Sequence, residues 1–231
     1  MNFRTAFVVA ALSVTAASMK AQVGFPPAAS PYRDVENGAR GSVFAGWYAA
    51  NHDPAGVFPK SAPMFGVRWD VYIGGPADFT ARLATVPTKR DVLDPSKPAG
   101  QRFVESKSIA LSMADIGIAF NLTGKKSWHA ILPSANVGVG LVSDFQGRDA
   151  GGYSHGTTFA LYYGLGVRIV PPEKRLSLRV DAGSYFYSTQ YPSSYFTPSS
   201  DGTSVVPGTQ SGGKWRNNWG LTLGATYVVF R

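Results

Sequence analysis

The sequence contains no cysteine and only three histidines. The absence of cysteine excludes disulfide bonds, thiolate metal sites and a lipidated N-terminal cysteine. Beyond its N-terminus the chain has no apolar run of about 18 residues or more, so no transmembrane helix is expected in the mature protein. The net charge is +8, but the basic residues form no consecutive block. This charge fits either an ordinary soluble surface or an affinity for anionic lipid head groups.

The N-terminus has the order of features found in secretory signals. Arg4 provides a positive charge, residues 6–14 form a short apolar core, and small residues follow at 15–18. We therefore predict a signal peptide over residues 1–21, with its cleavage site left open, and export from the cytoplasm. Residues 22–38, which include several prolines, are expected to form an irregular lead-in.

From residue 39 to residue 231 the chain shows the alternation of apolar with small or polar residues that is typical of strands. Eight segments carry this alternation: 39–50, 63–74, 77–87, 108–122, 128–143, 157–170, 176–187 and 219–229. They are longer than the roughly 5–6 residues of an average strand, and about 9–11 tilted residues cross the hydrocarbon layer. Within 108–122 the apolar parity changes between Met113 and Ile116, so we expect a β-bulge near Ala114.

The connections between these segments alternate in length. The long ones are 51–62, 88–106, 144–156 and 189–214, and the short ones are 74–77, 123–127 and 171–175. Outer-membrane barrels show this alternation because their periplasmic turns are short and their external loops are long. The loop 189–214 is rich in Ser, Pro and Gly, so we expect it to bury too little apolar surface to order itself and to be the most protease-sensitive external segment.

Within the predicted strands, the charged residues fall almost entirely on the positions that alternate with the apolar ones, which we call the polar parity. A membrane barrel turns this parity toward its lumen, whereas a soluble barrel would turn it outward. Signal peptide, loop alternation and strand length favour the membrane barrel. The candidate lumen network consists of Arg68, Asp70, Arg82, Asp115, Arg168, Arg179 and Asp181. An eight-stranded barrel has room for little more than its own side chains, so these groups should pair and plug the lumen. Glycines on the same parity either make room for them or ease strand curvature.

The run Ser134-Ala135-Asn136-Val137-Gly138-Val139-Gly140-Leu141 resembles the glycine-alternating strands of the outer-membrane β-barrel family that includes OmpA-type and OmpX-type domains. The resemblance covers about residues 39–231. It implies an all-β fold, namely an eight-stranded antiparallel up-and-down transmembrane β-barrel in the bacterial outer membrane. Outer-membrane lipids, including lipopolysaccharide, and the barrel-assembly machinery are the partners it implies. The family often ends in an aromatic residue, whereas here Phe230 is penultimate and Arg231 is last.

Catalytic chemistry has few candidate residues. His155, beside Ser154, is the best of them, but it lacks the His-x-Ser spacing of lipid A deacylases and an obvious acidic partner. His52 and Asp53 have no companions for a metal site. We expect no enzymatic activity, no cofactor and no nucleic-acid binding, and the oligomeric state is left open. The predicted role is structural or surface interaction. The alternatives are a narrow pore, a lipid A-modifying enzyme, or a soluble periplasmic lipid-binding barrel.

Overall fold

The computed structural model describes residues 30–35, 38–172, 174–207 and 213–230. The predicted signal peptide, residues 1–21, lies outside this range, and so does most of the segment predicted as a lead-in. Among the described residues, no helix is long and apolar enough to cross a bilayer. The strands lie in one compact unit, Tyr32–Arg231.

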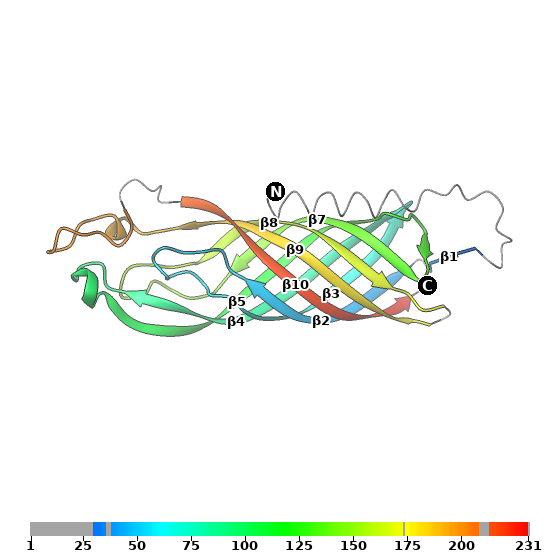
Figure 1. Cartoon of the computed structure of the whole chain (residues 1–231), viewed down its shortest axis with the longest axis horizontal. Coiled ribbons are helices and arrows are strands. Elements are labelled where there is room, and N and C mark those ends of the chain that lie inside the picture. Colours follow the sequence, from blue (N-terminus) through cyan, green and yellow to red (C-terminus); the bar gives the residue numbers. More distant parts are fainter. Residues whose placement is uncertain (1–29, 36–37, 173, 208–212, 231) are drawn as a thin grey trace, which may run out of the picture. The chain divides into compact units, whose positions relative to one another are not determined.

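Eight long antiparallel strands form a closed ring (Figure 1). They are β2 (Ala39–Ala49), β3 (Ala62–Gly74), β4 (Ala77–Leu93), β5 (Phe103–Asn121), β7 (Ile131–Ser143), β8 (Thr157–Ile169), β9 (Leu176–Gln190) and β10 (Gly213–Phe230). Sequence neighbours pair with one another, and β10 pairs with β2 to close the ring. Each of the eight predicted segments contributes one of these strands, which confirms the predicted up-and-down topology.

The outer wall of the ring is apolar and the inner wall is polar. Outward positions carry exposed residues such as Phe65, Val67, Leu83, Ile116, Val139, Leu165, Leu178 and Leu223. Inward positions on the same strands carry buried charges, among them Arg68 on β3 and Arg179 on β9. Because a soluble barrel would place these two sets the other way round, the fold is that of a barrel surrounded by lipid.

The predicted β-bulge near Ala114 is wrong. The register of β5 runs without a break past Ala114, which lies opposite Leu83 on β4 and Leu141 on β7. The apolar parity changes because Leu111 and Met113 are buried inside the barrel. The lumen itself therefore changes from polar to apolar along its axis, while the wall stays regular.

Strands β4 and β5 extend well past their predicted ends. Residues 88–93 and 103–107 were predicted as loop, yet they pair as strands, with one register shift between Val92 and Leu93, so the connection itself is only 94–102. The alternation fades here because polar side chains occupy both faces, as Thr88, Lys89 and Arg90 show. With 17 residues in β4 and 19 in β5, this hairpin exceeds the roughly 9–11 residues of a membrane span. It therefore projects beyond the bilayer on the long-loop side.

Two short strands were not predicted. β1 (Tyr32–Asp34) pairs with β6 (Lys126–Trp128), and each has three residues. The lead-in predicted as irregular over 22–38 therefore contains a short strand, and the short connection predicted over 123–127 contains the first two residues of β6. Three residues are too few to reveal a period of two. After β6 the chain reverses through His129 and Ala130, whose positive φ angles of 47° and 64° suit a tight hairpin turn. Short 3-10 turns, η2 (Ala99–Gln101) and η3 (Ser193–Tyr195), lie in the loops at the other end.

Candidate functional site

The seven predicted network residues all lie inside the barrel, and two pairs of them form its centre. Arg68 Nε donates to Asp70 at 2.7 Å on β3, and Arg179 Nε donates to Asp181 at 2.6 Å on β9. Longer contacts join the two strands, with Arg68 at 3.9 Å from Asp181 and Arg179 at 4.0 Å from Asp70. Asn136 on β7 accepts a hydrogen bond from both arginines, at 3.1 and 3.2 Å. The four charges are thereby linked across the lumen.

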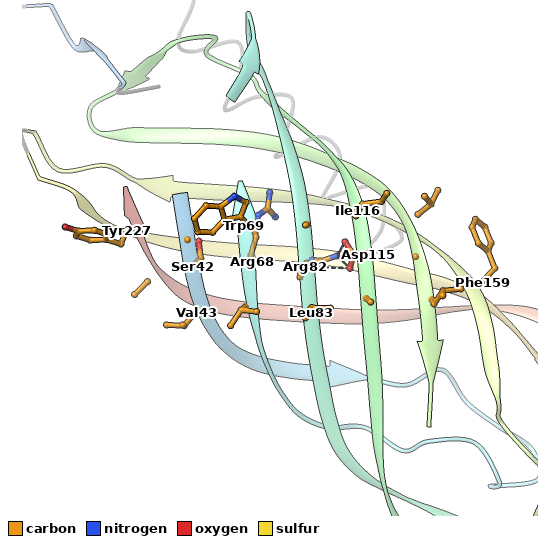
Figure 2. Close-up of a pocket in the computed structure, with 18 of the residues that line it drawn as sticks. Ser42, Val43, Arg68, Trp69, Arg82, Leu83, Asp115, Ile116, Phe159 and Tyr227 are labelled. Atoms are coloured by element: carbon orange, nitrogen blue, oxygen red, sulfur yellow. Dashed lines mark hydrogen bonds and ion pairs between the residues drawn. The ribbon is translucent and has the colours of Figure 1, made fainter. Parts of the chain in front are cut away.

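A third ion pair joins neighbouring strands. Arg82 on β4 donates to both carboxylate oxygens of Asp115 on β5, at 3.0 and 3.1 Å (Figure 2). The guanidinium of Arg82 also stacks over the ring of Tyr162, 3.6 Å from its centroid, and faces Tyr185 at 5.1 Å. Arg82 therefore joins the ionic part of the lumen to its aromatic part.

A fourth ion pair was missed by the sequence reasoning. Arg40 on β2 contacts Asp78 on β4 at 2.6 Å, and Asp78 also accepts a hydrogen bond from Asn121 at 3.0 Å. Arg40 and Asp78 each stand next to a strand end, where the alternation gives little signal. We call the buried polar groups at the short-turn end the ionic layer: Arg40, Arg68, Asp70, Asp78, Arg82, Asp115, Asn136, Arg168, Arg179 and Asp181.

Glycines make room for the large side chains of the lumen. A Cβ atom added to Gly183 would lie 2.4 Å from the Tyr162 hydroxyl and 2.5 Å from its ring. One added to Gly166 would lie 2.3 Å from Asp181 Oδ1. At these two positions the absence of a side chain serves packing, so the space-making interpretation of the glycine pattern holds there.

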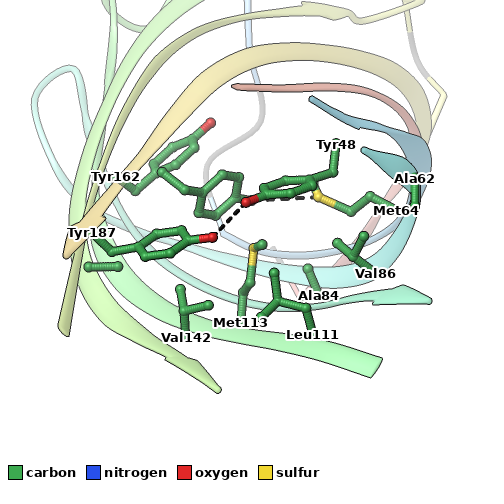
Figure 3. Packing of buried hydrophobic residues seen from close by; sticks show 12 residues of the cluster. Tyr48, Ala62, Met64, Ala84, Val86, Leu111, Met113, Val142, Tyr162 and Tyr187 are labelled. Carbon is green, nitrogen blue, oxygen red and sulfur yellow. Dashed lines mark hydrogen bonds between the residues drawn. The ribbon is translucent and has the colours of Figure 1, made fainter. Parts of the chain in front are cut away.

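Beyond the ionic layer the lumen is filled by tyrosine, methionine and aliphatic side chains (Figure 3). We call this set the tyrosine layer: Tyr48, Ala62, Met64, Ala84, Val86, Leu111, Met113, Val142, Ala160, Tyr162, Tyr185 and Tyr187. The hydroxyls of Tyr48 and Tyr187 hydrogen-bond at 2.6 Å across the lumen. The layer is buried and apolar, in contrast to the charged layer beside it.

Above the tyrosine layer the long loops pack together into what we call the loop cap: Val57, Phe58, Tyr153, Tyr191, Tyr195 and Val206. Tyr195 and Val206 are fully buried. The prediction that 189–214 buries too little apolar surface is therefore wrong over 191–207, whereas 208–212 lie outside the described residues. The aromatic residues of this loop are scattered among Ser and Pro without any period, so no sequence pattern indicated that they would be buried.

Polar contacts hold the loop cap together. Tyr191 donates a hydrogen bond to Asp53, and this bond together with burial raises the pKa of Tyr191. Arg90 on β4, which is fully buried, donates to Asp149 at 2.6 Å. Arg102 donates to the carbonyl of Thr203 at 2.6 Å. These bonds join all four long loops to one another or to the strand ends.

His155 lies under the loop cap without a nucleophile beside it. Its Nδ1 is 3.5 Å from the Tyr153 hydroxyl, and its ring meets Tyr187 edge-on. The Ser154 hydroxyl donates instead to the carbonyl of Gln146 at 3.3 Å. Burial lowers the pKa of His155, and Asp144 partly offsets this effect. Among the described residues, no group of three or more His, Asp or Glu side chains is placed to hold a metal ion.

A closed ring of eight strands with an apolar exterior and a charged lumen defines the class of small outer-membrane β-barrels. The solved structure of the outer-membrane protein OprG from Pseudomonas aeruginosa has this fold. It matches 84% of the present chain and 97% of its own, with a TM-score of 0.51 and 12% identity. The N-terminal β-barrel domain of OprF from the same organism matches 83% of this chain and 97% of its own, with a TM-score of 0.46 and 8% identity. No family model and no curated protein matches the sequence.

Proposed function

We propose that this protein resides in the bacterial outer membrane, has a lumen closed by its own side chains, and serves a structural or surface-interaction role. The observation that carries the proposal is the stacking of three closures along one lumen: the ionic layer, the tyrosine layer and the loop cap. Neither catalysis nor solute transport is part of this role.

The apolar wall supports the membrane location. Soluble monomers rarely expose apolar patches larger than a few hundred Å², whereas here the exposed large apolar side chains are spread over all eight strands. The hollow of Figure 2 is lined by outward-facing Val43, Leu83 and Phe159, among others. Such a lining suits the acyl chains of surrounding lipid.

The pairing in the ionic layer supports a closed lumen. Charges in a low-dielectric interior are costly unless they are paired, and the bridges link β3, β7 and β9 across the space that water would have to cross. The loop cap supports the interaction role, because ordered loops present a defined surface with little entropy left to lose on binding.

Two measurements test the proposal. The mature protein should fractionate with outer membranes and resist high-salt and alkaline extraction. Recovery from the soluble periplasmic fraction would overturn the membrane location. In planar bilayers the purified protein should show no steady conductance. Reproducible single-channel currents from the unmodified protein would instead support a narrow pore.

A further inference from the structure

The ionic layer carries one more positive than negative charge among the described residues. Its arginines are Arg40, Arg68, Arg82, Arg168 and Arg179, and its aspartates are Asp70, Asp78, Asp115 and Asp181. Every aspartate in it contacts an arginine at 3.1 Å or less. Four of the five arginines make these contacts, so one arginine has no aspartate in contact with it.

That arginine is Arg168. It is buried, yet within the described part of the chain no carboxylate lies within 4.0 Å of it, and its Nε has no hydrogen-bond partner. Its cross-strand neighbour on β9 is another arginine, Arg179, and Arg40 also acts on it as a like charge, while the carboxylates of Asp70 and Asp78 act on it only from beyond 4.0 Å. A buried and unpaired cation among like charges is strongly unfavourable. An anion beside Arg168 would remove this penalty.

Arg40 provides a second donor at the same end of the lumen. Its Nη2 contacts Asp78 at 2.6 Å, but its Nε is buried without a partner among the described residues. Arg40 is the second residue of β2 and Arg168 the next-to-last residue of β8, so both lie near the short-turn end of the barrel. Guanidinium N–H groups match the oxygens of phosphate and carboxylate groups.

The surface around this end favours the approach of anions. Lys125, Lys126, Lys174 and Arg175 are all exposed in its turns. Among the described residues of this end, Asp34, 3.9 Å from Lys126, offsets part of this charge, whereas Glu36 and Glu173 lie outside the described residues. A cluster of like charges raises the local concentration of ions of the opposite sign and speeds their arrival.

We propose that Arg168 and Arg40 form a binding site for a small oxyanion, a phosphate or carboxylate group, which enters the lumen from the short-turn end. Because both side chains face the lumen, we assign the site to a freely diffusing anion. The site requires only the folded barrel, so its failure would leave the proposed structural role standing.

Inorganic phosphate is the first probe. The protein is folded in maltoside micelles, which contain no phosphate, and phosphate replaces a bulky sulfonate at constant ionic strength. The Nε–H resonances of Arg168 and Arg40 should shift saturably, and that of Arg82 should not. Arg168→Gln should weaken the apparent affinity about tenfold or more, as expected for loss of a charge-assisted hydrogen bond. The matched variant Arg82→Gln should keep the affinity.

Stability without phosphate gives a second measurement. Arg168→Gln should unfold in urea at the same or a higher midpoint than the native protein, because it removes an unpaired buried charge. Arg82→Gln should unfold at a lower midpoint, because it leaves Asp115 unpaired. A lower midpoint for Arg168→Gln, or a shift that rises linearly with phosphate without saturating, would overturn the site. A shift in phosphatidylglycerol nanodiscs but not with free phosphate would overturn entry of a free anion and assign the phosphate group to lipid.

Discussion

Arg68 with Asp70, and Arg179 with Asp181, repeat one short pattern on two different strands. In each pair the arginine bonds the aspartate two positions further along, at 2.7 and 2.6 Å. Residues two apart on a strand point to the same face, so each pair is set by its own strand. The contacts between strands, at 3.9 and 4.0 Å, then align the two pairs as the ring closes.

Removal of one aspartate should therefore be costly. Asp181→Ala leaves Arg179 buried with neutral hydrogen-bond partners and with Asp70, 4.0 Å away, as its remaining carboxylate contact. Such a loss typically destabilises a fold by about 3–5 kcal/mol. The check is the urea dependence of unfolding in lipid vesicles. Asp34→Ala is the matched control, because Asp34 is exposed and 3.9 Å from Lys126, and it should change stability little. Equal effects of the two variants would contradict a stabilising role for the network.

His155 should make the loop cap sensitive to acid. Burial holds its pKa below the usual value of 6.5, and nearby Arg90 adds to this effect while Asp144 opposes it. A group with a depressed folded pKa binds protons more readily when the loops open. Its stabilising contribution is therefore present above about pH 6.5 and is lost as the pH falls through the folded pKa. The neutral groups that face it are Tyr153 and Tyr187.

Limited proteolysis of the loops at 144–156 and 191–207 measures this effect. Cleavage should accelerate as the pH falls from 7.5 to 5, with a protease whose own pH dependence is corrected on an unfolded substrate. His155→Gln should flatten the profile, because glutamine does not titrate. An unchanged profile in that variant would assign the acid sensitivity to other groups.

At the scale of strands, the alternation of residue types predicted the strands because the two faces of each strand meet different environments. Lipid outside and charges inside select opposite residue types at successive positions, so β3, β8 and β9 were predicted together with the direction of their side chains. The pattern failed where that contrast fades. Along β5 the lumen turns apolar at Met113, and along β4 both faces are polar from Thr88 to Asp91. A period of two is visible only where the two faces of a strand differ.

The candidate site was predictable in part for the same reason. Charges in the middle of strands stood out against apolar neighbours, whereas Arg40 and Asp78 lie at strand ends, and Asn136 is neutral. The Arg68–Asp70 and Arg179–Asp181 pairs are set by their own strands, whereas the contacts between these pairs depend on which strands face one another across the ring, and this is a property of closure. Arg168 illustrates the limit, because the sequence predicted its place in the lumen but gave no indication that it would lack a carboxylate.

Packing between strands β8 and β9 should depend on glycine. Gly183→Ala would place a Cβ atom about 2.5 Å from the ring of Tyr162, which Arg82 holds from the other side at 3.6 Å. Overpacking of this kind costs about 1–3 kcal/mol, more than alanine regains over glycine in a strand. Unfolding in urea measures the loss. Gly100→Ala, where a Cβ meets nothing within 4 Å, should be neutral. Gly183→Ala combined with Tyr162→Leu should recover part of the loss, and no recovery would contradict the steric explanation.

At the scale of the whole molecule, the wall and the lumen meet different physical requirements: the wall must pair its backbone groups, and the lumen must be filled. Ring closure pairs the backbone groups of every strand, which lipid demands because it offers no hydrogen bonds. The lumen of an eight-stranded ring is then narrow enough for side chains alone to fill it. In this chain the filling changes from ionic to aromatic along the axis and ends under the loop cap. The closures that we propose therefore lie in series.

Barriers in series make a specific prediction for conductance. Arg82→Ala with Asp115→Ala removes one bridge of the ionic layer, and Tyr48→Ala with Tyr187→Ala removes the hydrogen-bonded pair of the tyrosine layer. Each double variant leaves the other layer in place, so each should remain as silent in planar bilayers as the native protein. The quadruple variant weakens both layers at once, although the Arg68–Asp70 and Arg179–Asp181 pairs remain, and should show transient currents. Protection against heat unfolding in gels checks that each variant is folded before it is measured. Steady current from either double variant alone would show that a single layer is the barrier, and the serial arrangement would then be wrong.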